Sequence, residues 1–345
     1  MPKAAGTFYA ALIAAATLSA PSIAVEPAAD IYGGHTVTIL VGYGAGGTYG
    51  QTSQLVSKYL DKKIPGNPAI VVQYMTGAGG LKMANYAYNV APKNGLYFLM
   101  TPELAVVTQV LRPDKIKYDA SKFAAIGRVF GTNQVMVVRR DVGARSLKDL
   151  TKQEVIVASS GVGSPTDLVP TMANALLGTR FKIVQGYTGM AGCSLSVERK
   201  ETFGMSGPWS FWKASRAPWF EGGDKSLAMA LFQSGDAREA DLPDVPLLTD
   251  LVTDPDDKAA ASLLATSSVI GRGYAFPPGV PAQLVEVIRT AFWEAVNDPA
   301  FKQQVEKQRL PWSPMKGADV QKFVDDVLKM SPAVVAKVQK MASGK

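Results

Sequence analysis

Residues 37–50 read Val-Thr-Ile-Leu-Val-Gly-Tyr-Gly-Ala-Gly-Gly-Thr-Tyr-Gly, and this stretch decides the fold. An apolar β-branched run ends in a glycine-rich loop, and apolar residues at helical spacing follow over 48–60. The N–H groups of a helix's first turn have no intrahelical partner, and the helix dipole places partial positive charge there. A strand, a glycine turn and a helix start therefore predict a binding site for an anion.

The same arrangement recurs twice. The run 70–75 is followed by Thr-Gly-Ala-Gly-Gly at 76–80, and the run 154–158 by Ser-Ser-Gly-Val-Gly-Ser at 159–164. The only histidine, His35, precedes the first strand and is expected on the surface. One histidine and one cysteine leave no Ser-His-Asp triad, Cys-His pair or zinc-ligand spacing. The sequence thus favours a protein that holds an anion over one that transforms it.

Composition sets the class of protein. The chain has 345 residues, 47% hydrophobic and 19% charged, which is typical of a soluble globular protein with two domains. The net charge of +7 is dispersed, without the basic runs of a nucleic-acid binder. Residues 1–24 resemble a secretory signal peptide with cleavage near Ala24, which predicts export to the periplasm. The single Cys193 excludes an intramolecular disulfide and is expected to be buried.

Strand-like and helix-like segments alternate along the rest of the chain, which predicts α/β lobes built on parallel sheets. We expect lobe 1 over 32–130 plus 236–345 and lobe 2 over 131–235. The expected strands are 37–41, 70–74, 96–100, 134–139, 155–158, 181–185, 202–205, 227–232 and 268–276. The expected helices are 48–60, 80–90, 166–177, 189–199, 282–297, 300–308, 317–329 and 332–341.

The first glycine loop also satisfies G-x-G-x-x-G, the dinucleotide-binding pattern. That reading needs an acidic residue at the end of the second strand, but residues 73–76 are Gln-Tyr-Met-Thr. Two alternatives remain: the glycines serve only a tight turn, or they leave room for an anion. The 159–164 loop is likewise open to ordinary capping, because Ser164-Pro165 fits an N-cap with proline after it and Asp167 stands at N3.

Ligands of open α/β sheets bind outside the carboxyl ends of the strands, so the loops there should converge. Thr188 and Ser206 lie at such ends. Trp209 either packs in the core or walls the pocket. Arg272 stands within the expected strand 268–276, where an unpaired charge is costly, so we expect it to face the cleft or to pair with a carboxylate.

Several separated segments resemble the tripartite tricarboxylate transporter receptors, the Bug-type periplasmic binding proteins. They are Thr-Gly-Ala-Gly-Gly-Leu-Lys-Met-Ala-Asn-Tyr at 76–86, Asn-Val-Ala-Pro-Lys-Asn-Gly at 89–95, Leu-Pro-Asp-Val-Pro at 242–246 and Ala-Phe-Pro-Pro-Gly-Val-Pro at 275–281. The likeness runs in order over essentially the whole chain after the signal peptide.

The resemblance implies a type II periplasmic binding protein fold, with two α/β lobes that close like a Venus flytrap. It implies a receptor, not an enzyme, that delivers a small organic acid (a di- or tricarboxylate or an aromatic carboxylate) to a membrane permease. In the family the loop matching 43–49 grips one carboxylate through backbone N–H groups and waters, and the loop matching 159–164 grips from the other lobe. Relatives often carry an acidic residue where this chain has Gly50, so Gly50 is expected to alter the ligand.

We therefore predict a monomeric solute receptor that needs no cofactor or metal. A sensor of the same fold and a secreted hydrolase or lyase are the alternatives. The predicted ligand-binding residues are Tyr43, Gly44, Ala45, Gly46, Gly47, Thr48, Tyr49, Ala78, Gly79, Thr101, Ser159, Ser160, Gly161, Gly163, Ser164, Thr188, Ser206, Trp209 and Arg272. Lys82 is a further source of positive charge.

Overall fold

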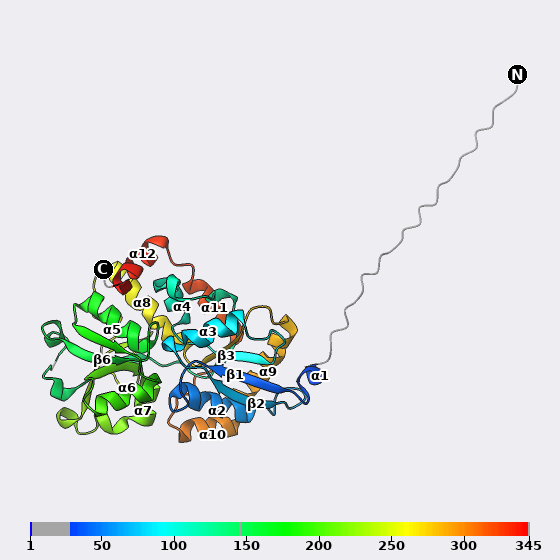
Figure 1. Ribbon diagram of the computed structural model, residues 1–345, viewed down its shortest axis with the longest axis horizontal. Coiled ribbons are helices and arrows are strands. Elements are labelled where there is room, and N and C mark those ends of the chain that lie inside the picture. The colour runs from blue at the N-terminus through cyan, green and yellow to red at the C-terminus, as the bar shows by residue number, and fades with distance from the viewer. Residues whose placement is uncertain (2–27, 145, 344–345) are drawn as a thin grey trace.

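Two β-sheets, each covered by helices on both faces, form the molecule (Figure 1). The computed structural model describes residue 1 and residues 28–144 and 146–343, so the predicted signal peptide lies outside the described residues apart from Met1. The first sheet has the order β11-β4-β10-β3-β1-β2 and the second β7-β6-β8-β5-β9. We call each sheet with its helices a lobe.

The strands of the first sheet come from both ends of the chain. They are β1 (Thr36–Val41), β2 (Ala69–Tyr74), β3 (Tyr97–Met100), β4 (Ala124–Arg128), β10 (Gly273–Phe276) and β11 (Met315–Lys316). Those of the second sheet are β5 (Gln134–Arg139), β6 (Val155–Ser159), β7 (Phe181–Gln185), β8 (Gly204–Pro208) and β9 (Ala228–Ser234).

Twelve α-helices are assigned among the described residues. They are α1 (Ala28–Tyr32), α2 (Thr48–Leu60), α3 (Leu81–Asn89), α4 (Ala105–Leu111), α5 (Pro165–Leu177), α6 (Gly189–Glu198), α7 (Trp209–Ser215), α8 (Pro255–Ile270), α9 (Ala282–Asn297), α10 (Pro299–Lys307), α11 (Gly317–Val327) and α12 (Pro332–Ser343). Within the described part of the chain, none of them combines the length and apolar character needed to cross a membrane.

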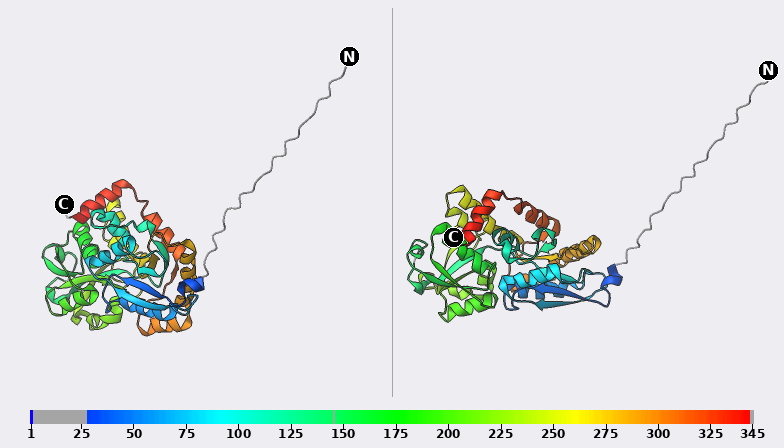
Figure 2. Two further views of the ribbon diagram at one scale, coloured as in Figure 1. Left: turned by 45° about the vertical axis from the view of Figure 1, so that its right-hand side comes forward. Right: turned by 45° about the horizontal axis from the view of Figure 1, so that its top comes forward.

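Each sheet lies between two layers of helices. Residues of α2, α9 and α10 pack on one face of the first sheet, and residues of α3 and α11 pack on the other. On the second sheet, α5 and α8 cover one face, while α6 and α7 cover the other, with Trp209 and Trp212 of α7 in the packing. The C-terminal α12, red in Figure 2, lies against α4, α5 and α8. Two helices from the segment 236–345 thus pack beside the second sheet, whose strands all lie within 131–235.

The expected parallel sheets are only partly parallel. β1 pairs parallel with β2 and β3, and β6 pairs parallel with β7 and β8. β10 runs antiparallel to both β3 and β4, and β5 runs antiparallel to β8 and β9. β5 and β10 each follow a passage of the chain from one sheet to the other, and the short edge strand β11 is also antiparallel to β4.

The expected strand at 268–276 is wrong over its first five residues. Residues 268–270 belong to α8, and only Gly273–Phe276 form a strand. The hydroxyls of Ser267 and Ser268 donate to the carbonyls of Leu264 and Ala265, which satisfies these buried polar groups inside the helix. The sequence interpretation also omitted β4 and α4, which are short and lack glycine or capping signals at their starts.

Candidate functional site

A cavity opens between the lobes at the carboxyl ends of β1, β6 and β8, as expected for this kind of sheet. The space that atoms leave empty there, partly open to solvent, amounts to about 470 Å³. Its wall on the first lobe comprises Tyr43, Gly44, Gly46, Gly47, Thr48, Tyr49 and Glu103. Its wall on the second lobe comprises Ser160, Pro165, Thr166, Thr188, Gly189, Met190, Ala191 and Pro208.

The first glycine loop presents an uncapped helix start to this cavity. Gly47 is the N-cap of α2, and no side chain accepts a hydrogen bond from the first turn. The ring of Tyr43 lies 4.3 Å from that of Tyr49, and its hydroxyl donates to the carbonyl of Gly79 at 2.6 Å. These contacts hold the loop while leaving the N–H groups at the start of α2 without a side-chain acceptor. An anion in the cavity would meet the positive end of the α2 dipole.

The two lobes approach each other closely across the first loop. A Cβ built on Gly44 would lie 3.8 Å from Cγ2 of Thr188, and one built on Gly46 would lie 3.8 Å from Cβ of Ala191. Both distances are ordinary van der Waals contacts, so any larger side chain at these glycines would occupy the space between the lobes.

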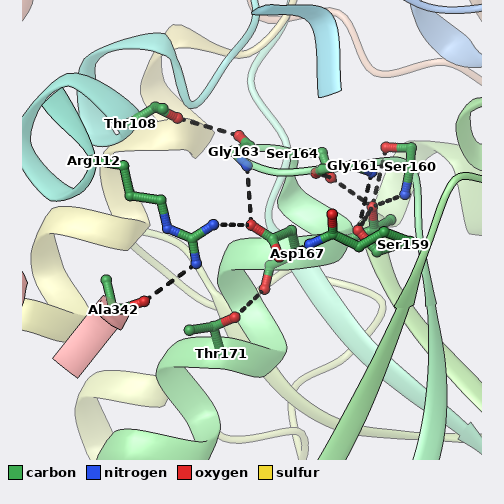
Figure 3. Close-up of polar contacts among 12 residues, drawn as sticks. Thr108, Arg112, Ser159, Ser160, Gly161, Gly163, Ser164, Asp167, Thr171 and Ala342 are labelled. Carbon is green, nitrogen blue, oxygen red and sulfur yellow. Dashed lines mark hydrogen bonds and ion pairs between the residues drawn. The ribbon is translucent and has the colours of Figure 1, made fainter. Parts of the chain in front are cut away.

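The second glycine loop is different, because the chain supplies its own anion (Figure 3). The carboxylate of Asp167 accepts from Gly163 N at 2.9 Å and from Arg112 Nη1 at 2.7 Å, and only 2% of this side chain is exposed. Its other oxygen accepts from Gln185 Nε2 at 3.0 Å. Burial raises the pKa of Asp167, and the charge of Arg112 together with the Gly163 hydrogen bond opposes that rise.

Hydroxyls occupy further donors of the second loop. Ser160 N donates to Thr166 Oγ1 at 2.8 Å, and Gly161 N donates to Ser159 Oγ at 3.1 Å. Ser164 N donates to the carbonyl of Gly161 at 3.1 Å. The N–H groups of Ser160, Gly161, Gly163 and Ser164 are thus bonded within the protein. Ser164 stands at the N-cap of α5 as the capping alternative expects, but its side chain makes no cap hydrogen bond.

Glycines in the second loop also serve contact between the lobes. Gly161 has φ +124°, and a Cβ there would lie 2.9 Å from Gly79 N. Gly79 has φ +61°, and its Cβ would lie 2.8 Å from Ser164 N. The loops 76–80 and 159–164 thus touch backbone to backbone, which only residues without a side chain allow.

A buried ion pair lies behind the first loop. Arg272 Nη1 contacts Glu103 Oε2 at 2.6 Å, and neither side chain is exposed. Arg272 also donates to Thr48 Oγ1 from Nε at 3.1 Å and from Nη2 at 2.7 Å, and its guanidinium lies 4.2 Å from the ring centroid of Tyr49. The expectation that Arg272 faces the cleft or pairs with a carboxylate is confirmed in its second form. Its position in the turn between α8 and β10 corrects the mid-strand placement.

Glu103 is fully engaged at both oxygens. Gln134 Nε2 donates to its Oε1 at 2.8 Å, and the Glu103 backbone N donates to the Tyr49 hydroxyl at 3.0 Å. Burial raises the pKa of Glu103, while the charge and hydrogen bond of Arg272 oppose the rise.

The structure places the other predicted residues as follows. Ala78 and Gly79 line a polar hollow beside the cavity. The hollow and the cavity share Tyr43, Ser160, Thr188 and Gly189. Thr101 lines a separate hollow next to Tyr274. The residues that line neither the cavity nor the polar hollow are Ala45, Thr101, Ser159, Gly161, Gly163, Ser164, Ser206, Trp209 and Arg272.

Some of these residues have clear structural partners. Ser206 Oγ donates to the carbonyl of Pro165 at 2.6 Å, and Trp209 Nε1 donates to Asp241 at 3.1 Å, with the Trp209 ring in the core. Lys82 is exposed and lies over Gly77. Gly50 does not line the cavity, and a Cβ there would lie 2.5 Å from the carbonyl oxygen of Ala45. The expectation that Gly50 alters the ligand stays a prediction.

Sequence reasoning missed seven lining residues: Glu103, Pro165, Thr166, Gly189, Met190, Ala191 and Pro208. Met190 and Ala191 could have been predicted from the sequence, because they lie in the first turn of the helix whose N-cap is the predicted residue Thr188. Glu103 carried no local signal, since its partners lie far away in the sequence. Among the described residues, no group of three or more His, Cys, Asp or Glu could hold a metal ion.

Comparison with known proteins adds the following. The model of the tripartite tricarboxylate transporter family receptor matches residues 54–340. A curated Agrobacterium vitis protein, "UPF0065 protein in the TAR-I ttuE-ttuC' intergenic region", is 30% identical over 174 residues. That alignment covers 48% of this chain and 49% of the relative, so the chain spans about half the length of the curated relative it matches.

Solved structures show the same fold. A periplasmic transporter aligns with a TM-score of 0.66 at 20% identity, covering 90% of this chain and 97% of that one. MatC from Rhodopseudomonas palustris, solved with bound malate, aligns with a TM-score of 0.66 at 16% identity, covering 89% and 99%. An R. palustris protein with adipate aligns with a TM-score of 0.65 at 18% identity, covering 90% and 98%. The fold is that of two-lobed periplasmic binding proteins, and the matched family consists of solute-binding receptors rather than enzymes.

Proposed function

Because the chain belongs to the tripartite tricarboxylate transporter receptor family, we propose that it captures a small organic carboxylate between its lobes and delivers it to a membrane permease. The observation that carries this proposal is the uncapped start of α2, which opens into the cavity between the lobes. Relatives of the same fold were solved with malate and with adipate, which supports a carboxylate as the ligand.

In the proposed mechanism the ligand carboxylate docks against N–H groups of residues 44–49. The contact between the tilted rings of Tyr43 and Tyr49 fixes this loop, and Arg272 donates a hydrogen bond to the hydroxyl of Thr48. The second lobe adds the Ser160 hydroxyl and the segment 188–191 as the lobes close. The ligand stabilises the closed state because its contacts with the second lobe form only when the lobes are closed. In this proposal each moving lobe is one sheet with its helices. The division near residues 130 and 236 expected from the sequence assigns α8 and α12 to the first lobe, whereas both pack beside the second sheet.

We place the receptor in the periplasm, exported by residues 1–24 and cleaved near Ala24, and acting as a monomer without a cofactor. The family match and the periplasmic proteins of the same fold support this location. We propose that the permease binds the closed, ligand-bound form of the receptor.

The direct test is a thermal-unfolding screen of the chain from residue 25 onward against mono-, di- and tricarboxylates. A ligand that binds only the folded state at about 100 times its Kd adds about 2.7 kcal/mol of stability. We expect at least one carboxylate to raise the midpoint, with amides of the same acids as controls that should not. A screen in which no carboxylate shifts the midpoint would contradict the proposal. Uptake of the identified acid by cells with and without this receptor then tests delivery.

A further inference from the structure

We propose that Met190 is a specificity-determining residue of this receptor: its side chain sets how long a ligand body the cavity admits. This inference rests on the proposed function and deepens it, because it concerns the same cavity and identifies what limits the ligand there. It is independent of the number of carboxylates that the ligand carries.

The side chain of Met190 separates the cavity from a glycine of the second sheet. Met190, in the first turn of α6, and Pro208, the last residue of β8, both line the cavity, whereas the neighbouring Gly207 does not. A Cβ built on Gly207 would overlap Cε of Met190 and would lie 3.1 Å from its Sδ. The end of the thioether chain therefore occupies the space directly over Gly207.

The floor beneath the thioether is firmly held. Gly207 is buried and pairs with Val135 of β5, and its carbonyl accepts from Trp212 Nε1 at 3.1 Å. Trp212 is fully buried, and its Cζ2 would lie 3.7 Å from the Cβ built on Gly207. Met190 is only half-buried, and methionine is the most adaptable of the apolar side chains. The part of this wall that can move is thus the Met190 side chain.

The polar contacts of the cavity do not depend on this side chain. The start of α6 also lines the cavity, and its N-cap Thr188 makes no side-chain cap hydrogen bond, as at Gly47 of α2. Both helix starts offer backbone N–H groups to a ligand anion, and a change of the Met190 side chain leaves these groups in place. Such a change alters the space for the ligand body and not its charged contacts.

Two substitutions change this space in opposite directions. Met190→Ala removes Cγ, Sδ and Cε and extends the cavity toward Gly207. Gly207→Ala fits the strand backbone, since φ of Gly207 is not positive, but its Cβ must displace the end of Met190. Trp212 closes the other side, so the displaced thioether moves toward the cavity and shortens it. One methylene group more or fewer in an apolar pocket changes selectivity about 10–200-fold.

Calorimetric titration of the wild type and both variants with homologous acids tests the inference. The three series are butanoate, hexanoate and octanoate; succinate, adipate and suberate; and benzoate, phenylacetate and 3-phenylpropanoate. The series that binds the wild type most tightly carries the test. We expect Met190→Ala to shift the ratio of affinities toward the longer member of a neighbouring pair by at least about tenfold. Gly207→Ala should shift the same ratio toward the shorter member.

Leu195→Ala is the matched control. Leu195 lies on the same helix, is exposed and does not line the cavity, so its truncation should leave the ratio unchanged. Thermal unfolding of each variant verifies that it is folded, and Gly207→Ala keeps the test intact where Met190→Ala is unstable.

Ratios that stay unchanged in both variants, or a shift in Leu195→Ala as large as in Met190→Ala, would overturn the inference and leave the proposed function intact. Failure of all three series to bind the wild type would also overturn it. Failure of every carboxylate in the unfolding screen would contradict the proposed function itself.

Discussion

Glu103 and Arg272 pair at 2.6 Å with neither side chain exposed, although 169 residues separate them in the chain. Glu103 follows β3, and Arg272 lies in the turn where the chain returns from α8 to the first sheet. Gln134, the first residue of β5 in the second sheet, donates to the same carboxylate. The carboxylate of Glu103 therefore binds one residue from each of the two segments by which the chain passes between the sheets, Gln134 and Arg272. Through Arg272 it is also linked to Thr48, the first residue of α2.

Removing one member of this pair should destabilise the protein strongly. We expect Arg272→Met or Glu103→Gln to lower the free energy of unfolding by about 3–5 kcal/mol, because each leaves a buried polar group uncompensated. The double variant should lose less than the sum of the two. Urea unfolding followed by circular dichroism measures all three. Additive losses would show that the two side chains do not depend on each other.

Gly44→Leu should abolish ligand binding while leaving stability nearly unchanged. A Cβ at Gly44 meets nothing closer than 3.8 Å, so the backbone tolerates it, but the side chain would fill the space next to Thr188. Thermal unfolding with and without ligand distinguishes the two effects.

Gly163→Leu should instead destabilise the fold. Gly163 has φ +81°, and a Cβ there would lie 3.0 Å from Thr108 Oγ1, so a side chain is strained in both respects. A bulky residue is therefore expected to spare the fold at Gly44 but not at Gly163. Equal unfolding midpoints for the Gly44 and Gly163 variants would contradict this distinction.

Asp167 should be required for the second loop to form. Asp167→Ala removes the acceptor of Gly163 N and leaves Arg112 unpaired, and we expect a loss of about 2–4 kcal/mol, since one partner of a largely buried pair is gone. Asp167→Asn keeps an acceptor and should lose less. Acetate should restore part of the stability of the alanine variant, because a vacated helix start binds small anions. The measurement is the unfolding midpoint as a function of acetate concentration, with chloride at equal ionic strength as the reference.

Cys193 should be unreactive in the folded protein. It is fully buried, and burial raises the pKa of its thiol to about 12. Because the reactive species is the thiolate, iodoacetamide at pH 8 should label it only after unfolding. The folded pKa lies above the unfolded one, so the contribution of this thiol to stability is complete below about pH 8.5 and declines as the pH rises toward 12. Rapid labelling of the native protein at pH 8 would contradict the burial.

Local patterns predicted the first glycine loop and most helices correctly, because strand, turn and helix-start signals lie within about a dozen residues of each other. The same signals placed Asp167 at N3 of α5 and kept ordinary capping open, and the hydrogen bond from Gly163 N follows from that position. Glu103 could not be found in this way. Its role depends on Arg272 and Gln134, which reach it only through the packing of both sheets.

The self-contained second loop also bears on how binding is distributed over the molecule. The hydrogen bonds that Asp167 makes to that loop need no solute, and the buried pair behind Thr48 holds the start of α2 in the same way. Preorganised sites lose little conformational entropy on binding, so a small solute that makes few contacts can still be bound with high affinity.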